Sequence, residues 1–414
     1  MQLHKRLNYD QTALVFDLYS KGKLPLKYAL LKLNIKQRRF YQLLNLYKTH
    51  DLYRVFDKRQ RPKKRIPQIM ELAIKEELLK EQTIIHNPDI PIDRYNYSHV
   101  RDEVVNQTGI EVSAETVRKR AIALGFYIKR YSNFKAHTRQ ILTDKPGTIL
   151  QHDSSHHLFA PFGSIKWGLI TTIDDFSRKL LYAKFVEDDT AWDHIKAVET
   201  VCKKFGIPAN YYVDNHSIFR FVKNMDSYWH VPRTNHAHVL TSWGQCLKAL
   251  DIGIFHAMSP QAKGKVERPY RWLQDRVVRK CSKLNIKSIH DGQNILDDEV
   301  YRYNAKTIHS TTNEVPDIRF GNAIKENNTS FKKLLIPAPY RAIEDIFCIR
   351  EPRIVSGYLT VSWRNHQIKV PEFVPIGSEI ILHVVPDKNK PQIRMWFNEE
   401  LIQVIFLAPT NKVL

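Results

Sequence analysis

The order of short apolar runs after residue 147 constrains the fold of this chain more than any other feature of its sequence. Three strand-like runs come first, and helical and strand-like stretches alternate after them. In chain order, these stretches are residues 148–153, 165–173, 180–186, 191–205, 210–214, 242–250, 253–256 and 264–280. A meander of three strands followed by alternating helices and strands predicts an α/β sheet with mixed strand directions.

Acidic residues close two of these strand-like runs. Asp153 follows residues 148–152, and Asp214 follows residues 210–213. This order of elements is the one found in ribonuclease-H-like (RNase H-like) domains, in which these two strands lie side by side. A third acid, Glu267, lies in the helix predicted from residue 264 and can point toward the edge of the sheet. It adjoins an apolar stripe with helical spacing, formed by Val266, Tyr270, Leu273 and Val277.

Convergence of Asp153, Asp214 and Glu267 would create a metal site. Carboxylates gathered at one point repel and raise each other's pKa unless a hard divalent cation neutralises them. The predicted cofactor is Mg²⁺ or Mn²⁺, with two ions roughly 4 Å apart that activate a water or a DNA 3′-hydroxyl for in-line attack on a phosphodiester. Strand transfer of this kind needs no ATP, and the phosphate-binding pattern G-x-x-x-x-G-K-[ST] is absent from the sequence. The alternative is three unrelated surface acids, because polar residues often mark the ends of buried strands.

Motifs around the second and third acids carry a resemblance to a known family. They are YVDNHSIF at residues 212–219 and SPQAKGKVER at residues 259–268, followed by LQDR at residues 273–276. On these residues, the chain resembles bacterial insertion-sequence transposases with a DDE core like that of retroviral integrases, most closely the ISNCY type. The resemblance implies that Asp153, Asp214 and Glu267 bind the catalytic metal ions. It also implies that flanking helical units bind the terminal inverted repeats of the element.

Two features depart from the pattern of retroviral integrases. Asp214 and Glu267 are farther apart than in compact integrases, because residues 220–239 form an extra aromatic and basic segment. This segment could hold DNA or a partner subunit, or it could be a surface loop. The N-terminal region also lacks the His-His-Cys-Cys zinc pattern of those enzymes.

The charge of the chain indicates a polyanionic partner. Its 64 Lys and Arg residues outnumber 43 Asp and Glu residues, which gives a formal net charge of +21. Nucleic acid fits this charge best. No apolar run reaches about 18 residues, and the chain lacks a signal-peptide core at its start. We therefore expect a cytoplasmic, nucleoid-associated protein with no membrane partner.

The first 55 residues are expected to form a helix-turn-helix unit. Helices are predicted over residues 12–20, 26–33 and 36–47, and the third is amphipathic and basic, as a helix that enters the major groove would be. A small helical bundle with a solvated basic face is the alternative. Residues 56–66 read as a basic linker along phosphates, or as a solvated charge run. The predicted DNA-contacting residues are Lys36, Arg38, Arg39, Lys58, Arg59, Arg61, Lys63, Lys64 and Arg65.

Residues 67–128 are expected to form a second helix-turn-helix unit. Helices are predicted over residues 68–80, 97–108 and 114–124, with Ser113 as an N-cap and Gly125 just beyond the last helix. Basic side chains on the third helix would contact DNA, namely Arg118, Lys119 and Arg120. Residues 129–146 read as a connector. After residue 330, five short strand-like runs predict a small β-barrel over residues 330–414.

Other charged clusters near the three acids offer alternative binding sites. Lys263, Lys265 and Arg268 surround Glu267 and could bind DNA phosphates, or form a solvated helix start. His152, His156 and His157 beside Asp153 could instead hold zinc. That alternative leaves Glu267 and its motif unexplained. Asp174 and Asp175 fit a hairpin turn better than a metal site, and they stay outside the predicted triad, as do Glu187, Asp188 and Asp189.

The sequence therefore predicts a multidomain DNA transposase. Helix-turn-helix units would bind the terminal inverted repeats, and an RNase H-like α/β core over residues 147–325 would cleave the DNA and join it to target DNA as a metal-dependent polynucleotidyl transferase. A homo-oligomer on double-stranded DNA is expected, because two ends are joined in one reaction. The alternative is a catalytically inactive, transposase-derived DNA-binding regulator.

Overall fold

The computed structural model describes residues 3, 6–56, 66–128, 143–163, 165–214, 216–219, 240–257, 264–364, 366–387 and 389–408, without the side chains of residues 54 and 264–268. Its contacts divide the chain into two compact units, Met1–Glu71 and Leu72–Leu414. The finer domain boundaries proposed from the sequence stay a prediction. None of the helices in the described ranges is long and apolar enough to cross a membrane.

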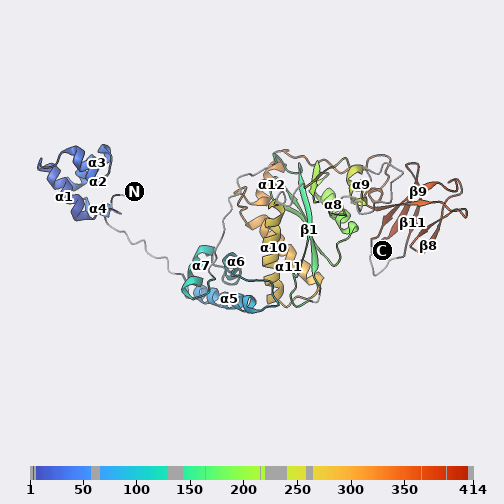
Figure 1. Cartoon of the computed structure of the whole chain (residues 1–414), viewed down its shortest axis with the longest axis horizontal. Helices are drawn as coiled ribbons and strands as arrows, with labels where there is room; N and C mark the ends of the chain where they lie inside the picture. The colour runs from blue at the N-terminus through green and yellow to red at the C-terminus, as the bar shows by residue number, and fades with distance from the viewer. Residues whose placement is uncertain are drawn as a thin grey trace, which may run out of the picture. The chain divides into compact units, whose positions relative to one another are not determined.

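The first unit is a group of helices around an apolar core. These helices are α1 (Tyr9–Ser20), α2 (Leu26–Leu33), α3 (Gln37–Lys48) and the short α4 (Tyr53–Phe56) (Figure 1). Asn8 starts α1 with a capping box. The Asn8 side chain accepts from the backbone N–H of Gln11, and the Gln11 side chain accepts from the backbone N–H of Asn8. The core includes Phe16, Phe40 and Leu43, all fully buried. The three helices predicted from the sequence are present, and their assignment as a helix-turn-helix stays a prediction.

The second unit includes another group of helices before its sheet. They are α5 (Gln68–His86), which belongs to this unit from Leu72 onward, α6 (Tyr97–Thr108) and α7 (Ala114–Ala123). The predicted N-cap of α7 is present, since Ser113 Oγ accepts from the Thr116 backbone N–H at 3.1 Å. Gly109 ends α6 in the left-handed conformation, at φ 67°, which glycine adopts without steric cost. All three helices lie where the sequence predicts them.

A five-stranded sheet forms the centre of the second unit. Its strands are β1 (Leu150–His157), β2 (Trp167–Asp174), β3 (Leu180–Val186), β4 (Asn210–Val213) and β5 (Gly253–His256). They lie in the order β3-β2-β1-β4-β5. The β1–β2 and β2–β3 pairs are antiparallel, whereas β1–β4 and β4–β5 are parallel. This is the RNase H-like arrangement of the integrase-type core, and it confirms the predicted mixed sheet.

Helices cover both faces of this sheet. Figure 1 shows α8 (Ala191–Phe205) and α9 (Ser242–Ala249) on one side of β1, and α10 (Gly264–Lys283) and α11 (Ile289–Lys306) on the other. Two apolar clusters correspond to these layers. One joins β4 and the α8–α9 layer, and the other joins β2 to α10 and α11. A further helix, α12 (Pro316–Lys325), packs against α11.

The C-terminal strands do not confirm the predicted barrel. The 3-10 helix η3 (Ile343–Asp345) precedes an open sheet of order β11-β10-β9-β6, and β7 and β8 form a separate hairpin. The strands are β6 (Ile349–Ile354), β7 (Thr360–Trp363), β8 (His366–Lys369), β9 (Glu379–Val385), β10 (Gln392–Phe397) and β11 (Glu400–Phe406). In the described residues no closed barrel forms, because β6 and β11 each pair with a single neighbour. The hairpin contributes Val361 and Trp363 to the apolar core of the sheet instead of extending it by hydrogen bonds.

Candidate active site

Asp153 and Asp214 lie on neighbouring parallel strands. In the β1–β4 ladder, Leu150 pairs with Tyr211 and Gln151 with Tyr212. Continued for two more residues, this register brings Asp153 level with Asp214, which follows the last residue of β4. Adjacent strands are about 4.8 Å apart, so the two residues are placed for their carboxylates to share one ion. Both are partly buried.

Both aspartates belong to the face of the sheet that α10 covers. Along β4, Tyr211 and Val213 are buried in the cluster with α8 and α9, so the alternation of side chains turns Asp214 to the opposite face. Asp153 pairs with Thr171 of β2, and cross-strand partners share a face. The Thr171 hydroxyl donates to the Tyr270 hydroxyl of α10 at 2.9 Å. Asp153 and Asp214 therefore face α10.

The third predicted acid, Glu267, lies in the first turns of α10. Its side chain is outside the described residues, so its position is judged from its helix. Tyr270 follows by three positions, close to one helical turn, which puts both residues on the same face of α10. Burial raises the pKa of Tyr270 well above its ordinary value, and the negative charges of Asp153, Asp189 and Asp214 raise it further. The phenol of Tyr270 is thus within electrostatic reach of both strand aspartates.

The donor chemistry of the predicted site suits a hard cation. Carboxylate oxygens are the ligands that Mg²⁺ and Mn²⁺ prefer. Among side chains that the structure describes, no group of three or more His, Cys, Asp or Glu residues is placed to hold a metal ion. The side chain of Glu267 is not in that set. The residues of the zinc alternative, His152, Asp153, His156 and His157, are all described and do not form such a group.

The segment after Asp214 is held on both sides. The Asp214 carboxylate accepts from the backbone N–H of His216 at 2.9 Å, and the backbone oxygen of Asp214 lies 3.4 Å from His256 Nδ1. Phe219 is buried against His152 and Trp243, with ring centroids 5.6 and 4.8 Å apart. These contacts hold Asp214 and Phe219 of the YVDNHSIF motif in place.

One acid that the sequence analysis set aside belongs to a buried hydrogen-bond network beside Asp153. Asp189 precedes α8, and its carboxylate accepts from Ser154 Oγ and from His194 Nε2, each at 2.5 Å. Burial alone would raise the pKa of Asp189, but the bonds from His194 and Ser154 lower it to about 2. The sequence hints at this network only by placing Ser154 next to Asp153. It does not show that Ser154 contacts Asp189.

Asp174 and Asp175 form the predicted turn. Asp174 accepts from the backbone N–H groups of Gly147 and Ser177 at 2.9 and 2.8 Å. Asp175 accepts from Arg178 Nη1 at 2.7 Å. Both carboxylates are therefore engaged in holding the connection between β2 and β3.

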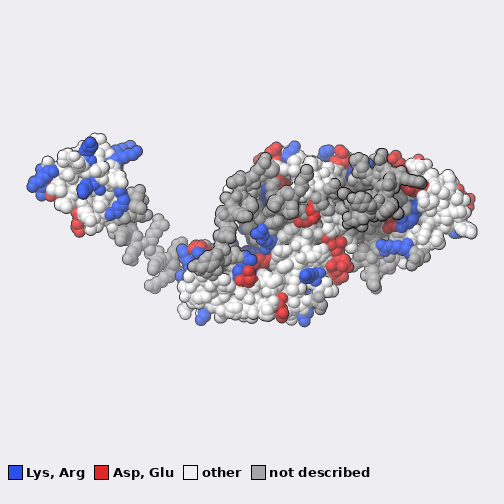
Figure 2. Space-filling view, viewed as in Figure 1, with Lys and Arg blue, Asp and Glu red and all other residues white. Residues whose placement is uncertain are grey.

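The basic residues predicted to contact DNA are partly described. Lys36, Arg38 and Arg39 are exposed at the start of α3, and Figure 2 shows Lys and Arg side chains spread over the surface of the first unit. Residues outside the described ranges, or with undescribed side chains, are Lys58, Arg59, Arg61, Lys63, Lys64, Arg65, Lys263, Lys265 and Arg268.

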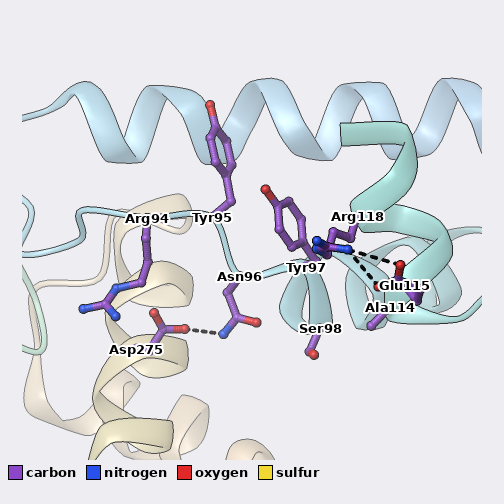
Figure 3. Close-up of a pocket in the computed structure, with 9 residues that line it drawn as sticks. All are labelled: Arg94, Tyr95, Asn96, Tyr97, Ser98, Ala114, Glu115, Arg118 and Asp275. Carbon is purple, nitrogen blue, oxygen red and sulfur yellow. Dashed lines mark hydrogen bonds and ion pairs between the residues drawn. The ribbon is translucent and has the colours of Figure 1, made fainter. Parts of the chain in front are cut away.

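A shallow cavity of about 280 Å³ lies between the starts of α6 and α7 (Figure 3). Arg118 lines it and pairs with Glu115 at 3.2 Å, and Lys119 is exposed. On the α10 side of the cavity, Asn96 donates to the Asp275 carboxylate at 2.5 Å. Neither Asp153 nor Asp214 lines this cavity, so it is separate from the predicted metal site.

Comparisons with known proteins find transposases. The chain is 29% identical over 271 residues to the putative transposase y4bF of Sinorhizobium fredii, covering 66% of this chain and 54% of that protein. It is 24% identical over 363 residues to the transposase for insertion sequence IS1202 of Streptococcus pneumoniae, covering 75% of this chain and 72% of the relative. The chain thus spans about half the length of the first relative. No family model matches it.

Among solved structures, the HTLV-2 integrase catalytic core domain in complex with magnesium matches 43% of this chain and 98% of its own, with 14% identity and a TM-score of 0.32. The simian T-cell lymphotropic virus intasome in complex with PP2A regulatory subunit B56 gamma matches 75% and 96%, with 13% identity and a TM-score of 0.34. The strand order identifies the core fold. The sequence matches confirm the resemblance that the motifs indicated, because the relatives that this chain is similar to are transposases, one of them the transposase of an insertion sequence.

Proposed function

We propose that this chain is a DNA transposase that binds the terminal inverted repeats of an insertion sequence and catalyses metal-dependent strand cleavage and strand transfer. Asp153, Asp214 and Glu267 are its catalytic, metal-binding residues. The observation that carries the proposal is the β1–β4 register, which sets Asp153 beside Asp214 on the face covered by α10. Glu267 lies on α10, close to one helical turn before Tyr270.

Each described residue of the site has a role that follows from its position. Asp153 lies on β1 and Asp214 directly follows β4, so the pairing of these two strands limits the spacing of the aspartates. The bond between Thr171 and Tyr270 ties α10 to the strand next to β1. Because the pKa of Tyr270 is raised, its phenol stays protonated and adds no negative charge beside the aspartates. A bound Mg²⁺ or Mn²⁺ ion would supply Lewis-acid chemistry and neutralise the acids.

The helical regions are proposed to bind DNA. Helices α1–α3 and α5–α7 would act as the two helix-turn-helix units, and the exposed Lys36, Arg38 and Arg39 at the start of α3 would contact the DNA. Arg118, Lys119 and Arg120 would do so from α7, and Lys263, Lys265 and Arg268 would bind phosphates at the DNA end being cut. Two element ends are joined in one reaction, so the active form is a homo-oligomer assembled on double-stranded DNA.

A plasmid assay separates this enzyme from a DNA-binding regulator. A supercoiled plasmid that carries the ends of the encoding element should be nicked or joined by the full chain with Mn²⁺, and not with EDTA. Unchanged plasmid despite tight binding of the ends would support the regulator instead.

The assignment of Glu267 has a matched control. Glu267→Gln keeps the size of the side chain and removes its charge, so we expect end binding to persist and strand joining to be lost. Glu187→Gln makes the same change at an exposed acid after β3 and should leave both activities intact. Strand joining by the Glu267→Gln variant would show that another acid completes the site.

A further inference from the structure

Two residues that flank Asp153 on β1 are tied to the same acid. Ser154 Oγ donates directly to Asp189 Oδ2 at 2.5 Å. On the other side of Asp153, His152 Nε2 lies 2.7 Å from His194 Nδ1, and His194 Nε2 lies 2.5 Å from Asp189 Oδ1. The network ends at Thr172 of β2, whose hydroxyl is 2.8 Å from His152 Nδ1. We refer to Asp189, His194, His152, Ser154 and Thr172 as the Asp189 network.

The direction of these hydrogen bonds follows from the carboxylate. An ionised carboxylate only accepts, so His194 Nε2 and Ser154 Oγ are both donors to Asp189. His194 Nδ1 is then left to accept from His152 Nε2, and His152 Nδ1 accepts from the Thr172 hydroxyl. Every member of the network therefore has a partner, which a buried polar group requires.

The network holds the face of β1 that is turned away from α10. Side chains alternate along a strand, so His152 and Ser154 lie on the α8 side, while Asp153 lies between them on the α10 side. Rings pack around the His152 imidazole, with Trp243 stacked on it at a centroid distance of 6.0 Å and Tyr211 edge-on at 5.9 Å. His152 and His194 are almost fully buried. The strand is thus fixed immediately before and immediately after Asp153.

We propose that Asp189 is a positioning residue for Asp153, which fixes the β1 backbone on both sides of the catalytic carboxylate through Ser154 and the two histidines. This inference rests on the proposed function, because it assumes that Asp153 holds the metal ion. Each of the two oxygens of Asp189 already accepts a short hydrogen bond from a member of the network.

The network matters because a cation site tolerates little displacement. Ligand residues must be held within about 0.5 Å of productive geometry, and loss of the partners that orient a ligand typically costs about 10- to 100-fold in metal affinity or activity. In this chain, the partners orient the strand that carries the ligand. Loss of the network should weaken metal binding more than it weakens folding or DNA binding.

The first test substitutes Ser154. Ser154→Thr keeps the hydroxyl that reaches Asp189, and Ser154→Val replaces it with a methyl group of similar shape, so the two variants differ only in the hydrogen bond. Mn²⁺ binding to the full chain with its DNA ends bound would be followed by electron paramagnetic resonance, with Glu267→Gln defining the signal that belongs to the site. We expect about 10-fold weaker Mn²⁺ binding for Ser154→Val and wild-type binding for Ser154→Thr.

The second test substitutes Asp189, with the exposed neighbour Asp188 as its control. Asp189→Ala should raise the Mn²⁺ concentration for half-maximal plasmid nicking by about 10- to 100-fold, whereas Asp188→Ala should leave it within about twofold. End binding should be unchanged in both. If Asp189→Ala does not fold, the two Ser154 variants decide the question alone.

The outcomes separate the two proposals. If the wild-type chain shows no Mn²⁺ signal that Glu267→Gln removes and no metal-dependent nicking, the proposed function fails. If the wild type behaves as an enzyme but Ser154→Val binds Mn²⁺ as well as Ser154→Thr, only the positioning role of Asp189 is overturned. A loss of binding in Ser154→Thr equal to that in Ser154→Val would also overturn it, because the loss would not depend on the hydroxyl.

Discussion

The two helical regions that precede the sheet, α1–α3 and α5–α7, have similar predicted helical patterns and different interiors. In both regions, the sequence predicts short amphipathic helices, and the last helix of each region is basic. In the first unit, the helices bury aromatic and aliphatic side chains such as Phe16, Phe40 and Leu43. In the second region, α5 and α6 bury charged residues as well, including Glu81 and Asp102.

These buried charges form an ionic seam with α10. The seam comprises Glu77 and Glu81 of α5, Asp102 of α6, and Arg276, Arg279 and Lys283 of α10. Arg276 pairs with Asp102 at 2.6 Å and Lys283 with Glu77 at 2.9 Å, and Arg279 pairs with Glu81 where both side chains are fully buried. A buried charge needs a partner, so α5 and α6 are complete only against α10.

The comparison shows that amphipathic helices with the same signature can be an independent unit in one place and part of a larger unit in another. The second region also contributes Ile84, Ile90 and Ile92 to the apolar cluster of the core. Because these ion pairs end on α10, we infer that the proposed second DNA-binding region is joined to the helix that carries Glu267.

The largest expected effect is on isolated fragments. Residues 1–71 should fold alone and melt cooperatively, because their apolar core is self-contained. Residues 66–128 should not, because Glu77, Glu81 and Asp102 would lose their partners. Circular dichroism melts of the two peptides measure the difference. Cooperative folding of residues 66–128 would contradict the role of the seam.

Removal of one seam partner should have the next largest effect. Arg279→Ala removes the nearest cation from the buried Glu81 and leaves it Lys283, whose Nζ lies 3.5 Å from its carboxylate, so the change should cost about 3 kcal/mol of the free energy of unfolding of the second unit. Lys287→Ala, which removes an exposed cation shortly after the same helix, should cost less than about 0.5 kcal/mol. Urea unfolding of the full chain compares them. Equal losses at the two positions would show that the seam does not stabilise the unit.

A smaller effect is expected from pH, through His99 of α6. Burial lowers the pKa of His99 well below its usual value, helped by the positive charges of Lys283, Arg276 and Arg279. A histidine with a depressed folded pKa contributes stability above the unfolded value of about 6.5, which is lost as pH falls below it. Between pH 6.5 and 5.5 this loss is about 1 kcal/mol. The stability difference between wild type and His99→Gln, from urea unfolding at each pH, should change by that amount, and a constant difference would contradict it.

The smallest effects come from matched helix caps in the two regions. Asn8 caps α1 and Ser113 caps α7, each through a side-chain oxygen that accepts from a backbone N–H. Asn8→Ala and Ser113→Ala should each cost about 1 kcal/mol. The same cost shifts the melting temperature of a small unit more than that of a large one, so Asn8→Ala should give the larger shift. A larger shift for Ser113→Ala would indicate that α7 unfolds in a small unit of its own.

Much of the fold could be predicted from local patterns. Hydrophobic periodicity and capping residues predict the helices α1–α3 and α5–α7. The order of apolar runs predicts the five strands of the core. β6 could not be predicted in this way, because Pro352 lies within it, and a proline argues against a central strand. The structure explains why β6 tolerates this proline, since β6 is an edge strand that pairs only with β9.

The sequence by itself determined which acids could meet, because a strand end and a motif are local properties that can be read along the chain at Asp153, Asp214 and Glu267. Only the tertiary structure decided what lies around them. The partners of Ser154, His152 and Arg279 come from Asp189, His194 and Glu81, which are far away in sequence. Pairing of buried polar groups is set by packing in three dimensions, and no periodicity along the chain encodes which acid meets which base.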